Sequence, residues 1–113
     1  MIVHIVEDDE AVADALAIAL EDLDRRAVTY RDGETFLAQA APLADDWVIV
    51  DLGLPGKSGA EIVQELMTLT DPPSVVAISG KSRAGLMAQL QKFPDLTVLR
   101  KPLSLQMLTA AFA

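Results

Sequence analysis

Short apolar runs alternate along the chain with stretches in which apolar residues recur at helical spacing. The runs are rich in Val and Ile and occupy residues 2–6, 27–30, 47–50, 75–78 and 96–99. The first run is continuously apolar apart from His4, which we expect to pack in the core. A continuous run is typical of a strand that is covered on both faces of its sheet. The pattern therefore predicts five short, largely buried β-strands.

The stretches between and after these runs predict helices. They start near Val12, Glu34, Ile62, Leu86 and Leu105, and the second is expected over residues 34–40. Asp9 stands where the first helix would begin, and a carboxylate there caps the free N–H groups of the first turn. Ala11, Ala15 and Ile18 lie off the main apolar face of this helix. They would contact either a partner's helix or the last helix of the chain.

Five strands that alternate with five helices predict an α/β fold with a parallel sheet. Crossovers of this kind are right-handed and place helices on both faces of the sheet. For five strands the common arrangement is a flavodoxin-like, doubly wound (βα)5 sheet in the order 2-1-3-4-5. The chain has no repeat or linker, so we expect one domain over residues 1–113, with a last helix short enough to be a truncated one.

Composition narrows the class of protein. The chain has 17 acidic residues against 9 Lys and Arg, a net charge of −8, and no cysteine. Disulfides and thiolate metal sites are therefore excluded. Direct binding to nucleic acid or to an anionic membrane is disfavoured, because both need cationic side chains. The apolar runs are far shorter than the roughly 20 residues of a membrane span, and the start lacks a signal peptide's basic region. We expect a soluble, cytoplasmic domain.

Polar residues follow four of the five predicted strands. Glu7 and Asp8 follow the first, Asp51 the third, Ser79 the fourth and Lys101 the fifth. Because parallel strands end at the same edge of a sheet, we expect these side chains to meet there. Three neighbouring carboxylates repel by about 4 kcal/mol per close pair at an effective dielectric constant of 20. A bound Mg²⁺ ion, which prefers oxygen ligands, would relieve this repulsion.

Four short motifs stand at these strand ends. They are Val6-Glu7-Asp8-Asp9, the segment from Asp51 to Gly59, Ile78-Ser79-Gly80 and Lys101-Pro102. Together, in this order, they resemble the receiver domains of two-component response regulators, and the resemblance covers nearly the whole chain. It implies a phosphorelay domain that takes a phosphoryl group from a histidine kinase or a histidine phosphotransfer protein. Such a domain is not an enzyme beyond its self-catalysed phosphotransfer and slow self-dephosphorylation.

The same resemblance implies roles for the acidic residues. Asp51 is the expected phosphoacceptor, because it begins the second motif. The expected Mg²⁺ ligands are Glu7, Asp8, Asp51 and the backbone carbonyl of Gly53. A carboxylate that accepts a phosphoryl group forms a reactive acyl phosphate. In this chemistry the bound cation neutralises charge while the protein positions the reacting groups.

The resemblance also implies how the phosphoryl group is read. Ser79 would bind a phosphoryl oxygen, and Lys101 would bridge Asp51 and the phosphoryl group. The peptide bond before Pro102 is expected to be cis, although only about 5–6% of such bonds are. One position departs from the family pattern: Val98 stands where receivers commonly carry Tyr or Phe. The usual aromatic element of the switch is therefore missing.

Two other functions stay open. A pseudo-receiver, which binds a protein partner without being phosphorylated, is favoured by Val98 and opposed by the intact acidic residues. A small phosphohydrolase with an aspartate nucleophile usually has a second Asp where Gly53 stands here, and its cap domain does not fit this length.

Nucleotide binding is excluded. The segments 56–58 and 80–82 resemble the end of a phosphate loop, but each lacks the glycine required five residues earlier.

Overall fold

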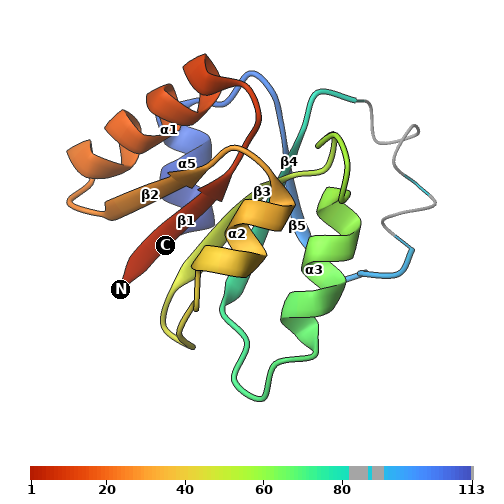
Figure 1. Cartoon of the computed structure of the whole chain (residues 1–113). Coiled ribbons are helices and arrows are strands. Elements are labelled where there is room, and N and C mark those ends of the chain that lie inside the picture. Colours follow the sequence, from red (N-terminus) through yellow and green to blue (C-terminus); the bar gives the residue numbers. More distant parts are fainter. Residues whose placement is uncertain (82–86, 88–90, 113) are drawn as a thin grey trace.

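Five parallel strands form one sheet in the order β2-β1-β3-β4-β5 in the computed structural model, which describes residues 1–81, 87 and 91–112. The strands are β1 (Ile2–Val6), β2 (Arg26–Tyr30), β3 (Trp47–Asp51), β4 (Ser74–Ser79) and β5 (Thr97–Arg100). The sequence-based prediction of a doubly wound α/β sheet in this order is confirmed (Figure 1).

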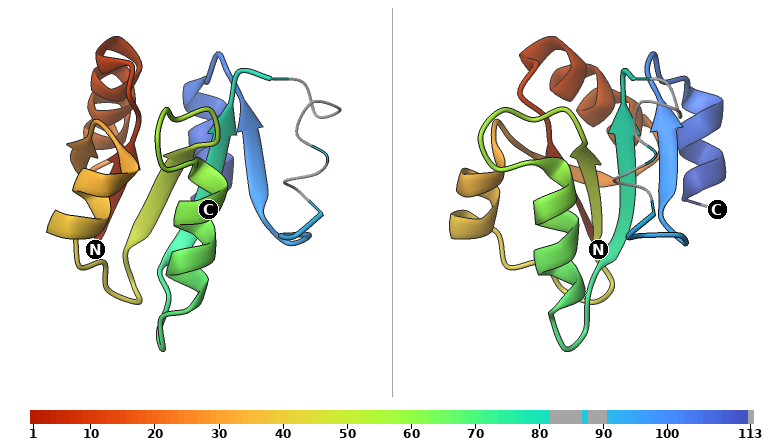
Figure 2. Two further views of the ribbon diagram at one scale, coloured as in Figure 1. Left: turned by 45° about the vertical axis from the view of Figure 1, so that its right-hand side comes forward. Right: turned by 90° about the vertical axis from the view of Figure 1, so that its right-hand side faces the viewer.

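Helices cover both faces of this sheet. The described helices are α1 (Glu10–Asp22), α2 (Gly33–Gln39), α3 (Gly59–Met67) and α5 (Leu105–Ala111). Helices α1 and α5 lie on one face, and α2 and α3 lie on the other (Figure 2). The helix predicted around Leu86 and Leu90 falls outside the described residues. None of the described helices is long and apolar enough to cross a membrane.

The helix starts follow from capping side chains. The side chain of Asp9 accepts hydrogen bonds from the N–H groups of Ala11 and Val12, which confirms its predicted capping role. Helix α3 begins with a reciprocal capping box between Ser58 and Glu61. It ends at Met67, whereas its apolar pattern continues to residue 69. The apolar pattern therefore overestimates the length of this helix by two residues, about half a turn.

Three strands, β3, β4 and β5, extend one residue beyond their apolar runs at the carboxyl end. Asp51 pairs in register with Ile78, and Ser79 pairs with Arg100, so the ladder continues through polar residues. The apolar runs predict that Asp51 and Ser79 lie just after their strands. The structure includes them as the last strand residues, where backbone hydrogen bonds hold them in place.

Two apolar clusters join the helices to the sheet. One packs Phe36 of α2 and Ile62 of α3 against one face, and the other packs Leu20 of α1 and Leu108 of α5 against the opposite face. All four residues are 0–2% exposed. Because β1 and β3 contribute side chains to both clusters, they are buried on both faces, as their apolar sequence predicts. These two central strands are therefore a rigid base for the residues at their carboxyl ends.

Candidate functional site

Three strands bring charged side chains to the carboxyl edge of the sheet. Glu7 directly follows β1, Asp51 ends β3, and Lys101 directly follows β5. The Lys101 ammonium donates to Glu7 Oε1 at 2.8 Å and to Asp51 Oδ2 at 3.2 Å. The residues that these bonds join are 94 and 50 positions apart in the sequence. The parallel topology therefore creates this contact, as the strand-end pattern predicts.

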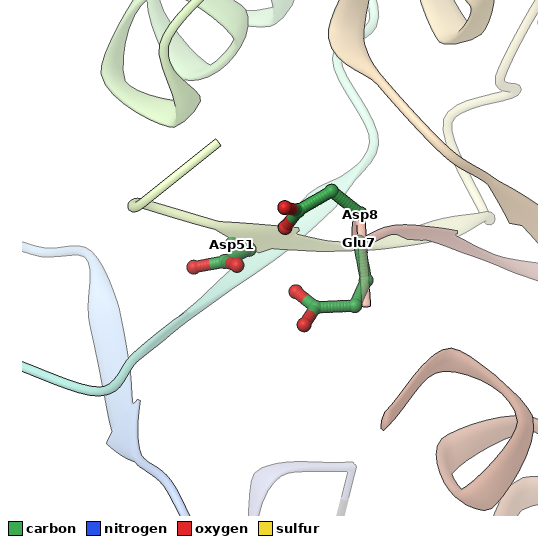
Figure 3. A group of neighbouring side chains, drawn as sticks. All are labelled: Glu7, Asp8 and Asp51. Carbon is green, nitrogen blue, oxygen red and sulfur yellow. The ribbon is translucent and has the colours of Figure 1, made fainter. Parts of the chain in front are cut away.

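Three carboxylates lie close together beside this ammonium group. Glu7, Asp8 and Asp51 each offer an oxygen atom, and these atoms all lie within 4.8 Å of one another. Figure 3 shows the three side chains converging on one space from the ends of β1 and β3. Glu7 and Asp51 are buried, with exposed fractions of 2% and 5%, whereas Asp8 is exposed. The cluster thus has two fixed, buried members and one on the solvent side.

One oxygen of this cluster lacks a hydrogen-bond partner. Within the described part of the chain, Glu7 Oε2 is the only buried side-chain nitrogen or oxygen atom without one. A buried polar atom left in this way costs about 1–3 kcal/mol, and more if it is charged. A hard cation would supply the missing partner, and three carboxylates are the ligand type that Mg²⁺ prefers. The residues present therefore fit a magnesium ion.

The pKa values at the site follow from burial and crowding. Burial and the neighbouring Asp51 carboxyl raise the pKa of Glu7 from 4.5 to about 7. Burial alone would also raise the pKa of Asp51, but the Glu7 carboxyl, the Gly53 N–H and the Lys101 ammonium hold it below its ordinary value. Burial would lower the pKa of Lys101, yet its contacts with Glu7 and Asp51 raise it. Near neutral pH, Asp51 is ionised and Lys101 is charged.

A family model described as the response regulator receiver domain matches residues 3–113. The chain belongs to this family. Because the match spans almost every residue, it includes the acidic cluster at β1 and β3 as well as Lys101. The resemblance inferred from the four sequence motifs is confirmed.

Individual receiver proteins are similar over nearly the whole chain. Sensory transduction protein RegX3 of Mycobacterium tuberculosis is 32% identical over 108 residues, which cover 96% of this chain and 47% of RegX3. Transcriptional regulatory protein FixJ of Azorhizobium caulinodans is 29% identical over 100 residues, 88% of this chain and 47% of FixJ. The chain spans about half the length of these relatives.

A solved structure shows the same fold. A CheY-like response regulator receiver domain from Methylobacillus flagellatus has a TM-score of 0.83 and 29% identity to this chain. The match covers 97% of this chain and 93% of that one. The receiver fold therefore accounts for essentially the whole of the present chain.

The other residues expected at the receiver's site lie around the same edge. Ser79 is 2% exposed, and its carbonyl accepts a hydrogen bond from the Lys101 N–H at 2.8 Å. Its hydroxyl oxygen accepts one from the Lys81 N–H at 3.0 Å and makes none to Asp51. The Gly53 N–H donates to Asp51 Oδ1 at 2.8 Å. Metal ligation by the Gly53 carbonyl stays a prediction.

Two further predictions concern β5 and the residues that directly follow it. The peptide bond between Lys101 and Pro102 is cis, the geometry that the resemblance implies. Val98 is half-buried and packs against the cluster under α2 and α3. That Val98 occupies the position of the family's usual aromatic residue stays a prediction.

A groove between α1 and α5 borders this edge, and the sequence predicted only part of it. Ala11 and Ala15 line a groove between α1 and α5 whose volume is about 520 Å³. Lys101 and Leu105 line it as well, so the groove borders the charged cluster. Ile18 stands outside the groove and is 61% exposed. The spacing of the small residues predicted this face, but not the groove or its connection to the site.

Proposed function

We propose that this receiver domain accepts a phosphoryl group on Asp51 from the phosphohistidine of a kinase or phosphotransfer protein. In that transfer the phosphorus–nitrogen bond breaks and a phosphorus–oxygen bond to the Asp51 carboxylate forms. The released imidazole takes a proton from water, and Asp51 becomes an acyl phosphate. The observation that carries the proposal is the carboxylate cluster that shares the Lys101 ammonium at one sheet edge.

The surroundings of Asp51 support a nucleophilic role. Its Oδ1 accepts a hydrogen bond from the Gly53 N–H and its Oδ2 one from Lys101, so the carboxylate is held in one orientation. Its lowered pKa keeps it ionised near neutral pH. Fixed orientation removes much of the entropic cost of a bimolecular transfer. Lys101 would then neutralise charge on the phosphoryl oxygens.

The cation's proposed ligands are Glu7, Asp8, Asp51 and the Gly53 carbonyl. When bound, Mg²⁺ would neutralise charge that develops on the phosphoryl oxygens. Glu7 and Asp51 would hold their oxygens in place because both are buried at strand ends. The unpartnered Glu7 Oε2 supports this assignment over a purely structural role for the cluster.

Phosphorylation would be read by Ser79 and Lys101. A phosphoryl group adds a charge of about −1.5 to −2 and three acceptor oxygens. Two charge-assisted hydrogen bonds contribute about 1.5–3 kcal/mol each. Reversing a 1:99 equilibrium to 99:1 requires about 5.5 kcal/mol, so these two bonds would suffice with little margin. With Val98 in place of an aromatic residue, we propose that the switch runs through Ser79 and the segment after Lys101.

The groove between α1 and α5 is the proposed docking face for the phosphodonor. It continues directly to Lys101, whose ammonium contacts Asp51. A donor that lies in this groove would therefore bring its phosphohistidine over the acceptor. The small side chains of Ala11 and Ala15 leave room for a partner's side chains on this face.

Water would remove the phosphoryl group slowly, without a dedicated catalytic residue. A side chain at Gly80, next to Ser79, would meet no described atom within 4 Å. That side of the proposed phosphoryl position is therefore not shielded by Gly80. We propose self-dephosphorylation as the only hydrolysis this domain performs.

Val98 supports a second candidate, a pseudo-receiver that binds its partner without phosphate. The intact cluster and the orphan oxygen of Glu7 favour the phosphoacceptor over it. Membership of the receiver family leaves the phosphohydrolase hypothesis without support.

Intact mass spectrometry after incubation with Mg²⁺ and phosphoramidate tests the proposal. We expect one added phosphoryl group on the wild-type chain and none on Asp51→Asn. Asp9→Asn is the matched control, because it removes one charge at the same edge while asparagine still caps α1. This control should be phosphorylated like the wild type. A wild-type chain that gains no phosphoryl group would favour the pseudo-receiver.

A further inference from the structure

The first residue of α3, Gly59, lies directly against the main chain of Asp51. A Cβ atom at Gly59 would overlap the carbonyl oxygen of Asp51 and stand 2.8 Å from the Cα of Leu52. Both are backbone atoms, which cannot rotate away as the end of a long side chain can. Gly59 is buried and helical, so the position requires space rather than an unusual backbone conformation.

The elements on both sides of this contact are fixed. The capping box of Ser58 and Glu61 holds the start of α3, with the Glu61 N–H donating to Ser58 Oγ at 3.2 Å. The body of α3 is held by Ile62, which is 0% exposed in the core. On the other side, the Leu52 N–H donates to the carbonyl of Ile78 at 2.9 Å. An added side-chain atom at Gly59 must therefore displace anchored backbone.

A shift of the peptide group between Asp51 and Leu52 would also move the Asp51 carboxylate. Carbon atoms in ordinary contact lie about 3.5 Å apart, so the Asp51–Leu52 main chain would move by roughly 0.5–1 Å. The Gly53 N–H, which follows at once, is bonded to Asp51 Oδ1 at 2.8 Å. The carboxylate of Asp51 and the backbone of Gly53 therefore move together, relative to Glu7 and Lys101.

We propose that Gly59 is a positioning residue. Its missing side chain lets α3 begin against the backbone of Asp51, and this contact sets where the Asp51 carboxylate meets Glu7 and the cation. This inference rests on the proposed function: its phosphorylation part on phosphotransfer to Asp51, and its metal-binding part on the proposed Mg²⁺ site alone. Gly59 itself touches neither the cation nor the phosphoryl group.

The chain offers a matched control in Gly33, the first residue of α2. A Cβ there would meet the side chain of Ile62, with Cγ1 at 3.0 Å and Cδ1 closer. The end of a side chain can rotate away, and no site residue is involved. Gly33→Ala and Gly59→Ala are therefore the same change at the same helical position, with different neighbours.

The test compares both variants with the wild type in two assays. The first follows phosphorylation by phosphoramidate through intact mass at a series of Mg²⁺ concentrations. The second measures Mg²⁺ affinity alone by calorimetry. Misplacement of reacting groups by about 1 Å costs up to a hundredfold in rate. We expect Gly59→Ala to be phosphorylated at least tenfold more slowly and to need more Mg²⁺, and Gly33→Ala to stay within about twofold of the wild type.

The outcomes separate this inference from the proposed function. If the wild type is phosphorylated and Gly59→Ala matches Gly33→Ala, the positioning role is wrong and the function stands. If the wild type is not phosphorylated, the function is wrong, and the Mg²⁺ affinities still decide the role of Gly59. Thermal unfolding of each variant shows that it is folded. Should Gly59→Ala unfold, the assays are repeated in trimethylamine N-oxide, which favours folded states; a chain that stays unfolded there overturns the positioning role.

Discussion

Two buried aspartates lie at opposite ends of β3 and have opposite surroundings. Asp46 directly precedes the strand and Asp51 ends it, with exposed fractions of 3% and 5%. The carboxylate of Asp46 accepts hydrogen bonds from the N–H groups of Ile2 and Leu43, each at 2.9 Å. It also contacts His4 Nε2 at 3.1 Å. Protein donors therefore satisfy this charge completely.

The cluster around Asp51 has too few donors for its charge. Glu7 and Asp51 share the ammonium of Lys101, Asp8 adds a third carboxylate beside them, and in the described part of the chain one oxygen of Glu7 has no partner. The pKa values of Asp46 and Glu7 reflect this difference in the number of donors. Burial would raise the pKa of Asp46, but its N–H donors hold it below the ordinary value, whereas the pKa of Glu7 rises to about 7. Both ends of β3 are buried, so burial does not distinguish them. The end that is suited to a cation is the one where the carboxylates have too few hydrogen-bond donors.

The network around Asp46 also explains the histidine in the central strand. His4 is 5% exposed, so the prediction that it packs in the core is confirmed. Its Nδ1 lies 3.1 Å from the hydroxyl of Tyr30, and the two rings stack at 5.9 Å. In the neutral imidazole, Nε2–H donates to Asp46, which only accepts, and Nδ1 accepts from Tyr30. Packing and hydrogen bonding thus act together at this position.

Removing the charge of Asp46 should have the largest effect on stability. In Asp46→Asn, an amide group replaces an acceptor oxygen and faces an N–H donor. We expect the free energy of unfolding to fall by about 2–4 kcal/mol, measured by urea denaturation. Asp45→Asn, at the exposed neighbouring position, is the control and should change it by less than about 0.5 kcal/mol. Equal losses in both variants would mean that the network contributes little.

The pH dependence of stability should differ in sign between Glu7, whose pKa is raised, and Asp46, whose pKa is lowered. Between pH 4.5 and about 7 the folded, metal-free chain keeps a proton on Glu7 that the unfolded chain has released. The contribution of Glu7 to the free energy of unfolding should therefore fall by about 1–3 kcal/mol as the pH rises through this range. Asp46, with its lowered pKa, stabilises the fold above its unfolded value and loses this as the pH falls below it.

Urea denaturation at a series of pH values, with a chelator present, separates these two contributions. Glu7→Gln should remove the decrease between pH 4.5 and about 7. Saturating Mg²⁺ should also remove it in the wild type, because the ion binds the ionised carboxylate. An unchanged slope in Glu7→Gln would show that Glu7 has an ordinary pKa.

The smallest effect is expected at the edge of the network. Tyr30→Phe removes the hydroxyl that contacts His4 Nδ1 and keeps the ring that packs on Phe36 at 5.3 Å. We expect a loss of about 1 kcal/mol in the free energy of unfolding and no change in phosphorylation. The double variant with Asp46→Asn should lose less than the sum, because His4 joins both groups. Strict additivity would contradict a connected network.

The sequence predicted the elements better than their ends. Val- and Ile-rich runs located the five strands, and Asp9 was correctly predicted as a helix cap, although the helical spacing placed the start of α1 near Val12 rather than at Glu10. The pattern overextended α3 to residue 69, because apolar spacing continues where the backbone has already turned. It also ended β3 one residue early, since a polar Asp51 interrupts the apolar run but not the hydrogen-bonded ladder.

The sequence predicted the acidic residues of the candidate site but not the residues that position them. Acids that directly follow apolar runs must reach one edge of a parallel sheet, so Glu7 and Asp51 could be placed together from the sequence. The role of Gly59 could not, because its contact with the Asp51 backbone depends on how closely α3 packs. Asp46 directly precedes the third apolar run, and nothing local in the sequence indicates its bonds to Ile2 and Leu43.

The sequence by itself determined the kind of fold, the edge where chemistry collects and the residue types available there. Periodicity and strand-end polarity are local properties, and in a parallel sheet they also fix which residues share an edge. Only the tertiary structure decided which carboxylate is satisfied and which is not. That depends on distances between groups up to 94 residues apart, such as Glu7 and Lys101. Donor counts and dielectric surroundings are set by packing, so the same side chain is a structural anchor at one end of β3 and a candidate ligand at the other.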